Sequence, residues 1–308
     1  MAILDRALVT LLPAVPKPVV RRLAERYIAG PELADAVRVV RRLNGEGKLA
    51  TLDVLGEEIT HADEARAIAG AYHDVLETID REQLDSNVSV KPTGLGLELS
   101  RDVCRENLEA LVVDSAAREN FVRIDMEDSS TTDDTLELYR ELRAAGQRRL
   151  GIVLQATLKR TLADVDALAD LRPNVRLCKG IYVEPATIAF REFEAVRTNF
   201  VRALDALLDA GCYVGIATHD EWLLQQGRRA VAERGLGPEQ YEFQMLLGVR
   251  PELGDELVRE GHRLRIYVPF GTDWYQYSLR RLQENPKIAG YVAADTVGRL
   301  LHPRRNGR

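Results

Sequence analysis

Hydrophobic and polar residues alternate along this chain in two different rhythms. From about residue 49 onward, short stretches rich in β-branched and aliphatic residues are separated by longer stretches in which apolar residues recur three and four positions apart. The short stretches predict β-strands, and the longer ones predict helices that place one face on a core. The strands predicted in this way cover residues 49–55, 87–91, 121–125, 151–155, 175–179, 212–217, 241–246 and 263–268.

Helices are predicted before the first strand, between strands and after the last one. Pro16 and Pro18 open one helical stretch and Pro31 opens another, because proline is tolerated in the first turn of a helix. A turn with the sequence PFGTD leads into the final helix, which stops at Asn285 and Pro286. The clearest helical patterns cover residues 19–28, 32–43, 62–78, 187–208, 221–233 and 274–284.

Regular alternation of strand and helix predicts a parallel sheet, and eight repeats is the number at which such a sheet closes into a barrel. We therefore expect an α/β fold of the (βα)8 TIM-like class. Its parts would be an N-terminal helical segment over residues 1–48, the barrel over 49–285 and a C-terminal tail over 286–308. A doubly wound open sheet is the alternative, although the sequence contains neither G-x-G-x-x-G after a strand nor a P-loop motif.

Composition narrows the class of protein further. A chain of 308 residues with 45% hydrophobic content can bury a sizeable core, and a net charge of -6 argues against a general nucleic-acid binder. No apolar run approaches the ~20 residues that cross a bilayer. The nearest approach to a signal peptide, Ala7–Val15, is preceded by Asp5 and interrupted by Pro13, so we expect a cytoplasmic protein. Three widely spaced cysteines favour neither a disulfide framework nor a zinc site.

Polar residues stand at the carboxyl ends of several predicted strands, which is where barrels of this class carry their chemistry. Lys91, Asp125, Gln155 and Tyr267 alternate with aliphatic neighbours on their strands. If the aliphatic set faces the helices, these four side chains face the barrel axis near its mouth. Ionisable groups in that position are costly unless they are paired or used. A structural ion pair and a functional site both remain open.

The fifth and sixth strands add candidates. Arg176 and Lys179 have opposite parity, so a regular strand cannot direct both inward, but a break near Gly180 would let both reach the mouth. Thr218 and His219 end the sixth strand and are placed at the rim. No second histidine with carboxylates has the spacing of metal ligands, so we expect no metal site.

The C-terminal part of the chain is basic. From Arg259 onward there are 10 Lys or Arg and 4 Asp or Glu, a balance of +6 in a chain whose total is -6. The final helix carries Arg280, Arg281 and Glu284, which indicates that something anionic is received here. An ordinary solvated helix face with a pair four residues apart is the alternative.

Taken together, these strand ends resemble the proline dehydrogenase family, both its short bacterial form and the equivalent domain of bifunctional proline-utilisation enzymes. The matching segments follow the family's order over most of the chain. They are DVLGE at 53–57, SVK at 89–91, RIDME at 123–127, VRLCKGIY at 175–182, ATH at 217–219, EFQMLLG at 242–248, RIYVPFG at 265–271 and YSLRRLQEN at 277–285.

The resemblance implies a distorted (βα)8 barrel that binds FAD without a Rossmann domain, with its last helix lying over the barrel mouth. It implies the first step of proline catabolism, in which L-proline is oxidised to Δ1-pyrroline-5-carboxylate. A hydride would pass to flavin N5 and the electrons would pass to a membrane quinone.

The family's functional residues can be carried over by position. Lys91, Arg280 and Arg281 would hold the substrate carboxylate. The residues that would shape or pair within the substrate pocket are Asp125, Leu246, Tyr267 and Glu284. Catalytic roles would fall to Lys91, Asp125, Arg176 and Tyr267. Glu57 also belongs to the family's site. Two departures, Ile181 and Val183, stand where the family often has alanine and an aromatic residue. The expected cofactor contacts are Gln155, Arg176, Lys179, Gly180, Tyr182, Thr218 and His219.

Two other functions fit parts of the pattern. A Schiff-base lyase would use Lys91 or Lys179 as its nucleophile, and a non-catalytic barrel would bind a carboxylate through the arginines. The basic end of the chain at 304–308 could attract anionic lipid, giving peripheral contact with the inner face of the membrane. A short basic terminus is more commonly just solvated. The sequence leaves the oligomeric state open.

Overall fold

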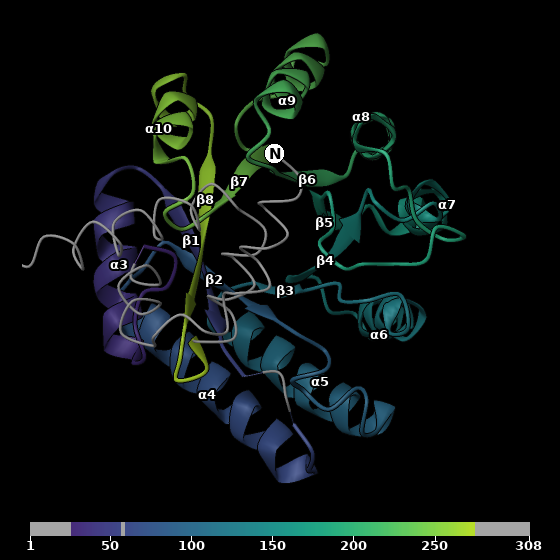
Figure 1. The fold of residues 1–308 in the computed structure, drawn as a ribbon. Helices are drawn as coiled ribbons and strands as arrows, with labels where there is room; N and C mark the ends of the chain where they lie inside the picture. Colours follow the sequence, from purple (N-terminus) through teal and green to yellow (C-terminus); the bar gives the residue numbers. More distant parts are fainter. Residues whose placement is uncertain (1–25, 57–58, 275–308) are drawn as a thin grey trace, which may run out of the picture.

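The computed structural model describes residues 26–56 and 59–274, and their strands close into one parallel barrel in sequence order, from β1 to β8 (Figure 1). The predicted barrel is therefore confirmed, and no predicted strand end is more than two residues from its observed position. The strands are β1 (Leu49–Val54), β2 (Ser86–Val90), β3 (Val122–Ile124), β4 (Leu150–Gln155), β5 (Asn174–Cys178), β6 (Tyr213–Ala217), β7 (Tyr241–Leu246) and β8 (Leu264–Phe270).

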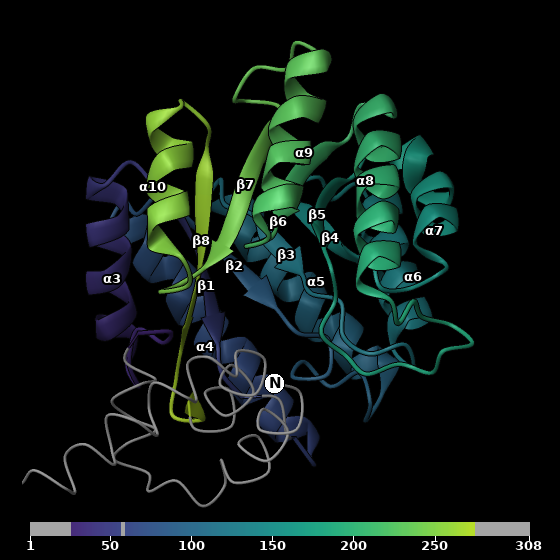
Figure 2. The ribbon, with the colours of Figure 1, turned by 45° about the horizontal axis from the view of Figure 1, so that its top comes forward.

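Helices cover the outside of the barrel (Figure 2). A short 3-10 helix, Ala169–Leu171, follows α7. The α-helices are α3 (Leu33–Gly45), α4 (Ala62–Arg81), α5 (Arg101–Ala117), α6 (Thr132–Ala144), α7 (Thr161–Leu168), α8 (Phe193–Asp209), α9 (Glu221–Glu233) and α10 (Pro251–Arg259). The predicted final helix at 274–284 lies outside the described residues apart from Trp274, as does the tail at 286–308.

The two faces of each strand have different partners. Val88, Val90 and Ile152 are fully buried between the strands and the surrounding helices. Each such side chain contributes roughly 1.5–3 kcal/mol relative to an exposed position. The alternate positions, such as Ser89 and Arg176, face the barrel interior and are also buried. The barrel therefore has an aliphatic outer core and a polar inner one.

The barrel closes where the first strand meets the last. β1 pairs with β8 in parallel from Leu49↔Arg265 to Val54↔Phe270. A hydrogen bond from Arg265 Nη1 to the Ala50 carbonyl, at 2.7 Å, reinforces this seam. Because every strand has two neighbours, the barrel has no free sheet edge.

Two predicted helices differ from the structure. The helix predicted at 187–208 begins only at Phe193, because the segment before it forms a turn and is then held to the loop after β4 by an isolated bridge between Leu158 and Ala189. Lys159 N donates to the Ile188 carbonyl at 2.9 Å, and Phe190 N donates to the Thr157 carbonyl at 2.8 Å. The other helix, predicted at 19–28, is wrong at its end, since residues 26–28 form a turn and irregular backbone; the rest lies outside the described residues.

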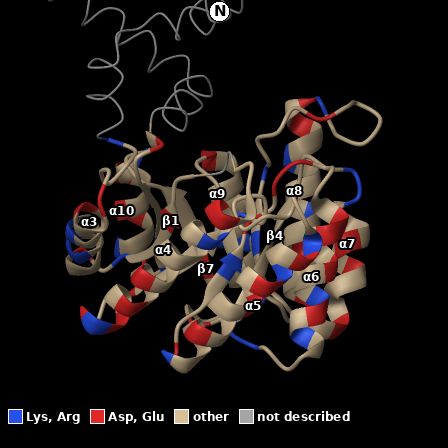
Figure 3. Ribbon diagram, turned by 90° about the horizontal axis from the view of Figure 1, so that it is seen from below, with Lys and Arg blue, Asp and Glu red and all other residues tan. Residues whose placement is uncertain are grey.

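Acidic and basic residues are interspersed along the outer helices α5, α6 and α7 (Figure 3). Arg101 on α5, for example, donates to Glu141 on α6 at 2.6 Å. Exposed pairs of this kind each contribute little to stability. Within residues 26–56 and 59–274, no helix is long and apolar enough to cross a membrane.

Candidate active site

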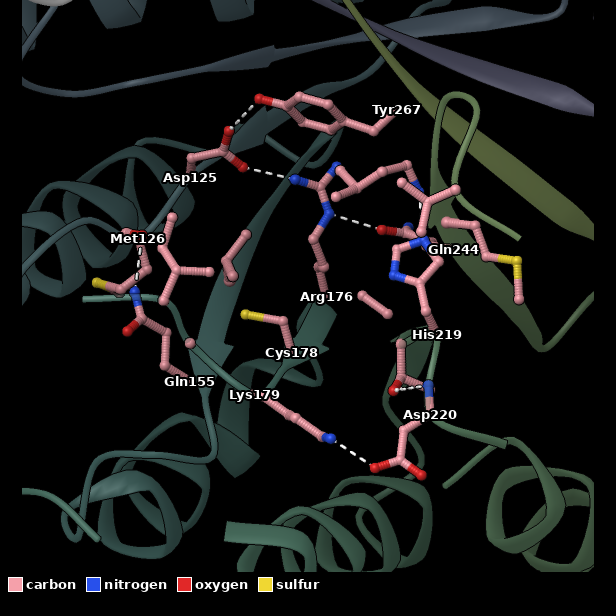
Figure 4. Close-up of a pocket in the computed structure, with 18 of the residues that line it drawn as sticks. Asp125, Met126, Gln155, Arg176, Cys178, Lys179, His219, Asp220, Gln244 and Tyr267 are labelled. Atoms are coloured by element: carbon pink, nitrogen blue, oxygen red, sulfur yellow. Dashed lines mark hydrogen bonds and ion pairs between the residues drawn. The ribbon is translucent and has the colours of Figure 1, made fainter. Parts of the chain in front are cut away.

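A cavity of about 1140 Å³ opens at the carboxyl ends of the strands. The four side chains predicted to face the axis, Lys91, Asp125, Gln155 and Tyr267, all line it, and Figure 4 shows the last three of these around one space. Further expected site residues also line the cavity: Arg176, Lys179, Gly180, Tyr182, Thr218, His219 and Leu246. The expected Glu57, Arg280, Arg281 and Glu284 lie outside the described residues.

Asp125, which follows β3, joins three side chains at the base of the cavity, and Figure 4 shows two of them, Arg176 and Tyr267. Its Oδ1 accepts hydrogen bonds from Arg176 Nη1 at 2.6 Å and from Ser89 Oγ at 2.7 Å. Its Oδ2 accepts from Tyr267 Oη at 3.0 Å. Burial first, and then the charge of Asp125, raise the pKa of Tyr267 well above its ordinary value. Tyr267 is therefore a neutral donor, and Asp125 is fixed by three partners.

Lys91 is held by a fully buried carboxylate. Its Nζ lies 2.5 Å from Asp53 Oδ1, at the end of β1. Tyr72 on α4 donates to the Ser89 carbonyl at 2.6 Å and lies 3.2 Å from the same Asp53 oxygen. Burial, reinforced by Asp53, raises the pKa of Tyr72 well above its ordinary value. The lysine thus presents its charge to the cavity from a rigid base.

The backbone break expected after β5 is present. β5 ends at Cys178, and Gly180 adopts a φ of +96°, a left-handed conformation that glycine adopts without strain. The turn directs Lys179 toward Asp220, which accepts from its Nζ at 2.5 Å. Arg197 on α8 binds the same carboxylate through both oxygens, at 2.9 Å and 2.7 Å. Burial alone would raise the pKa of Asp220, but the hydrogen bonds and charges of Arg197 and Lys179 hold it well below its usual range.

Gln155 presents a buried acceptor at the cavity wall. Its Nε2 donates to the carbonyls of Met126 and Glu127, at 2.8 Å and 2.9 Å, which fixes the orientation of the amide. Its Oε1 is buried and has no hydrogen-bond partner among the described residues. A Cβ at Gly180 would lie only 2.9 Å from that oxygen, so glycine keeps the approach open. A buried acceptor of this kind is costly unless a ligand donates to it.

His219, two residues after β6, contacts Leu246 at the end of the neighbouring strand β7. The backbone N–H of Leu246 donates to His219 Nε2 at 2.9 Å. A neutral ring whose Nε2 accepts carries its proton on Nδ1. Thr218 Oγ1 accepts from the N–H of Asp220 at 3.1 Å, which orders the start of α9.

The outer part of the cavity is aromatic and cationic. Phe193 and Trp222 line it and are 55% and 38% exposed. The guanidinium carbon of Arg197 lies 4.2 Å from the Phe193 ring centroid and 5.2 Å from that of Trp222. Lys179 Nζ also lies 4.6 Å above Phe193. These contacts give a surface suited to planar and anionic groups.

Several residues of the site have roles that we did not predict from the sequence: Asp53, Arg197, Asp220 and Gln244. Asp53 and Gln244 stand at inward positions of β1 and β7, where the parity rule used for the other strands would have found them. Within the described part of the chain, no group of three or more His, Cys, Asp and Glu is arranged to hold a metal ion.

The sequence is similar to a family model and to curated proteins over most of its length. The family model described as proline dehydrogenase matches residues 36–294. Proline dehydrogenase 1 of Bacillus subtilis (strain 168) is 39% identical over 269 residues, which cover 87% of this chain and 89% of that protein. Proline dehydrogenase of Deinococcus radiodurans is 37% identical over 274 residues, covering 88% of each.

The fold also matches solved structures. Proline utilization A from Bdellovibrio bacteriovorus, in a crystal structure of the form inactivated by N-propargylglycine, superposes with a TM-score of 0.83 at 22% identity. The match covers 92% of this chain and 36% of that one, so this chain spans about a third of the larger protein. At that identity the likeness shows the shared barrel.

Proposed function

Because the chain belongs to the proline dehydrogenase family, a family of oxidoreductases, we propose that its cavity oxidises L-proline to Δ1-pyrroline-5-carboxylate with bound FAD. The observation that carries this proposal is the arrangement of charged and polar strand ends around one large cavity. Lys91, Asp125, Arg176 and Tyr267 converge there from four different strands or the residues that follow them. Each is held by a partner recorded in the structure.

The residues present fit a flavin. The cavity of about 1140 Å³ exceeds the roughly 300–1,000 Å³ of pockets that hold drug-sized ligands, so it has room for a cofactor beside a small amino acid. A bound flavin supplies the acceptor for the substrate hydride. Gln155 Oε1, which has no hydrogen-bond partner in the described part of the chain, is an acceptor for a ring N–H, and Arg176 offers positive charge at the cavity base. Lys179, Gly180, Tyr182, Thr218 and His219 would complete the contacts.

The aromatic outer end of the cavity favours FAD over a smaller flavin. Phe193, Trp222 and the stacked Arg197 suit an adenine ring and phosphates, which FMN lacks in part. Trp222→Ala should therefore weaken FAD binding about tenfold, since base–aromatic stacking contributes about 1–3 kcal/mol. FMN binding should change by less than about twofold. Titrating apoprotein with each flavin by fluorescence measures both, and equal weakening for the two would argue against this assignment.

The substrate carboxylate would meet Lys91 and the arginines Arg280 and Arg281, which lie outside the described residues. Guanidinium groups grip a carboxylate bidentately and orient the ring, which lowers the entropic part of the barrier. Asp125, Tyr267 and Leu246 would shape the pocket, with Glu284 pairing nearby. Arg280→Ala or Arg281→Ala should raise the KM for proline roughly ten- to a hundredfold with flavin retained. An unchanged KM for proline in both variants would mean that the two arginines do not bind the substrate, as in the alternative of a solvated helix face.

The decisive experiment is an absorbance spectrum of the purified protein before and after anaerobic L-proline. A flavin band that bleaches supports the proposal, and an apoprotein that acquires no flavin spectrum with FAD contradicts it. A Schiff-base lyase would instead be trapped by borohydride. Against that alternative, the Nζ atoms of Lys91 and Lys179 each form an ion pair at 2.5 Å, whereas a nucleophilic lysine must be neutral.

We further propose a quinone as electron acceptor in a cytoplasmic enzyme that contacts the membrane peripherally. Ile181 and Val183, near the cavity mouth, are 52% and 89% exposed and suit a lipid-soluble molecule. The basic residues at 304–308, outside the described residues, could add attraction to anionic lipid. Sedimentation with anionic vesicles, at low and high salt, should show weaker binding after deletion of residues 302–308. Equal binding of both proteins would remove the tail from this proposal.

A further inference from the structure

Gln244 on β7 reaches the cavity's buried arginine from two strands away. Its Oε1 accepts a hydrogen bond from Arg176 Nε at 2.6 Å, and both side chains are buried (Figure 4). Arg176 Nη1 is occupied by Asp125 and Ser89, at 2.6 Å and 3.1 Å. Nη2 has no hydrogen-bond partner among the described residues. Arg176 lines the cavity, and with Nε and Nη1 occupied, Nη2 is the guanidinium nitrogen left for a ligand there.

A glycine on the intervening strand makes this reach possible. Gly215 on β6 pairs with Arg176 of β5 on one side and with Glu242 of β7 on the other. A Cβ at Gly215 would lie 2.4 Å from Gln244 Nε2 and 2.8 Å from its Cδ. The missing side chain therefore leaves the space that the Gln244 amide occupies as it crosses β6. The φ of Gly215 is not in the left-handed region, so space and not backbone conformation favours glycine here.

The orientation of the Gln244 amide is set from the opposite end of the barrel. Its Nε2 donates to Glu242 Oε1 at 2.6 Å, and Arg265 Nε donates to the same oxygen at 2.8 Å. An ionised carboxylate only accepts hydrogen bonds, so it requires the NH2 side of the amide. The carbonyl oxygen of Gln244 must then face Arg176. Glu242, itself buried, thus determines which atom the arginine meets.

We propose that Gln244 is a positioning residue that acts through Arg176, with Gly215 providing its path and Glu242 its orientation. By holding Nε, Gln244 fixes the guanidinium plane and directs Nη2 to the ligand. This inference rests on the proposed function, in which Arg176 adjoins the flavin. Loss of the Gln244 side chain leaves the charge of Arg176 in place but removes the alignment of its guanidinium group. That alignment matters most where charge develops during the reaction.

Two variants of the flavin-loaded protein test the assignment. Gln244→Leu removes the acceptor at similar volume, and Gly215→Ala displaces the amide without changing any polar group. Each should lower kcat for proline about tenfold, as expected for one hydrogen bond to a charged group. The KM should change by less than about threefold, and the midpoint potential of the flavin should shift to a more negative value. Gly70→Ala, on α4 with no atom near its added Cβ, is the matched control.

If either Gln244→Leu or Gly215→Ala fails to fold, the other variant still tests the proposal. A loaded variant with wild-type kcat and wild-type midpoint potential would overturn the positioning role. The wild-type protein separates this from the proposed function. If proline does not reduce its flavin, the proposed function fails. If proline does reduce it and the variants match it, only the role of Gln244 is wrong.

Discussion

Two buried arginines, one near each end of the barrel, differ in what holds them. Arg123 on β3 donates to the backbone carbonyls of Ile152 and Asn174, at 3.0 Å and 2.6 Å, and to the Asn174 side chain. It lines a second cavity of about 660 Å³, which also includes residues at the amino-terminal ends of strands. Arg176 on β5 is held instead by side chains, those of Asp125, Ser89 and Gln244.

This difference in partners distinguishes Arg123, a structural cation, from Arg176, a cation available to a ligand. Backbone carbonyls are fixed by the sheet, so Arg123 is locked in place, and no carboxylate of the described residues is bound to it. Burial, together with the charge of Arg176, lowers the pKa of Arg123 to about 9. Arg176 lines the larger cavity and is held by side chains that leave its Nη2 without a hydrogen bond among the described residues. The same residue type can thus stabilise one end of the barrel and serve a ligand at the other.

The largest effect expected from this comparison is the loss of Arg176. Arg176→Met should lower kcat/KM for proline about a hundred- to a thousandfold, roughly 3–4 kcal/mol, because the aligned charge that the proposed function places beside the flavin disappears. The variant should fold, as judged by circular dichroism. Steady-state kinetics measure the loss. A variant within threefold of wild type would show that the two arginines do not differ in this way.

The second largest effect is expected from acid, which should lower the stability provided by Glu242 near the amino-terminal end of the barrel. Burial alone would raise the pKa of Glu242, but Arg265, Gln244 and the charge of Arg123 lower it from 4.5 to about 2. Its stabilising contribution is therefore complete above pH 4.5 and is lost as the pH falls toward 2. The expected loss is about 3 kcal/mol of unfolding free energy. Urea titrations across this window measure it. Glu242→Gln should flatten the slope, and an equal slope in both proteins would contradict the assignment.

Removing the structural arginine should destabilise the protein and spare its chemistry. Arg123→Met leaves the Asn174 oxygen and two carbonyls without their donor, although it also removes a buried charge. We expect a net loss of about 2 kcal/mol in unfolding free energy by urea titration. At a temperature where the variant is folded, kcat should stay within about threefold of wild type. If Arg123→Met lowered kcat by more than its effect on the unfolding free energy, both expressed in kcal/mol, Arg123 would not be the structural arginine.

Two tyrosines provide the smallest and most closely matched test. Tyr267 donates to Asp125 at the cavity base, at 3.0 Å, and Tyr213 donates to Glu242 at 3.1 Å. Each hydrogen bond is worth about 1 kcal/mol. Tyr267→Phe should lower kcat/KM several-fold with little change in stability, while Tyr213→Phe should lower stability by about 1 kcal/mol with unchanged kinetics. Similar behaviour of the two variants would remove the distinction.

The sequence predicts which side chains face the barrel interior because alternation within a strand follows directly from its geometry. Val88 and Val90 pack outward against helices, and Ser89 between them turns inward to Asp125, as parity requires. The same rule finds Lys91 and Tyr267. Applied to β7, it would also have selected Glu242 and Gln244, whose side chains carry the contact between the two ends of the barrel.

The remaining parts of the site depend on tertiary contacts that parity does not describe. Asp220 is the N-cap of α9, accepting from Trp222 N at 3.1 Å, and it also binds Lys179 and Arg197. The position of Asp220 in the sequence predicts an N-cap but does not show that the same carboxylate also binds Lys179 and Arg197. The late start of α8 has a similar origin, because a bridge between Leu158 and Ala189 overrides local helical periodicity.

The seam between β1 and β8 affects how the chain can fold during synthesis. Ala50 and Arg265, which it joins, are 215 positions apart. A ribosome adding ~5–20 residues per second needs roughly 10 to 40 s to cover that distance. Throughout this interval β1 lacks one of its two neighbours, and an unpaired strand edge can pair with other chains. A translational pause between β7 and β8 would prolong that exposure and should increase the fraction of chains that aggregate before the barrel closes.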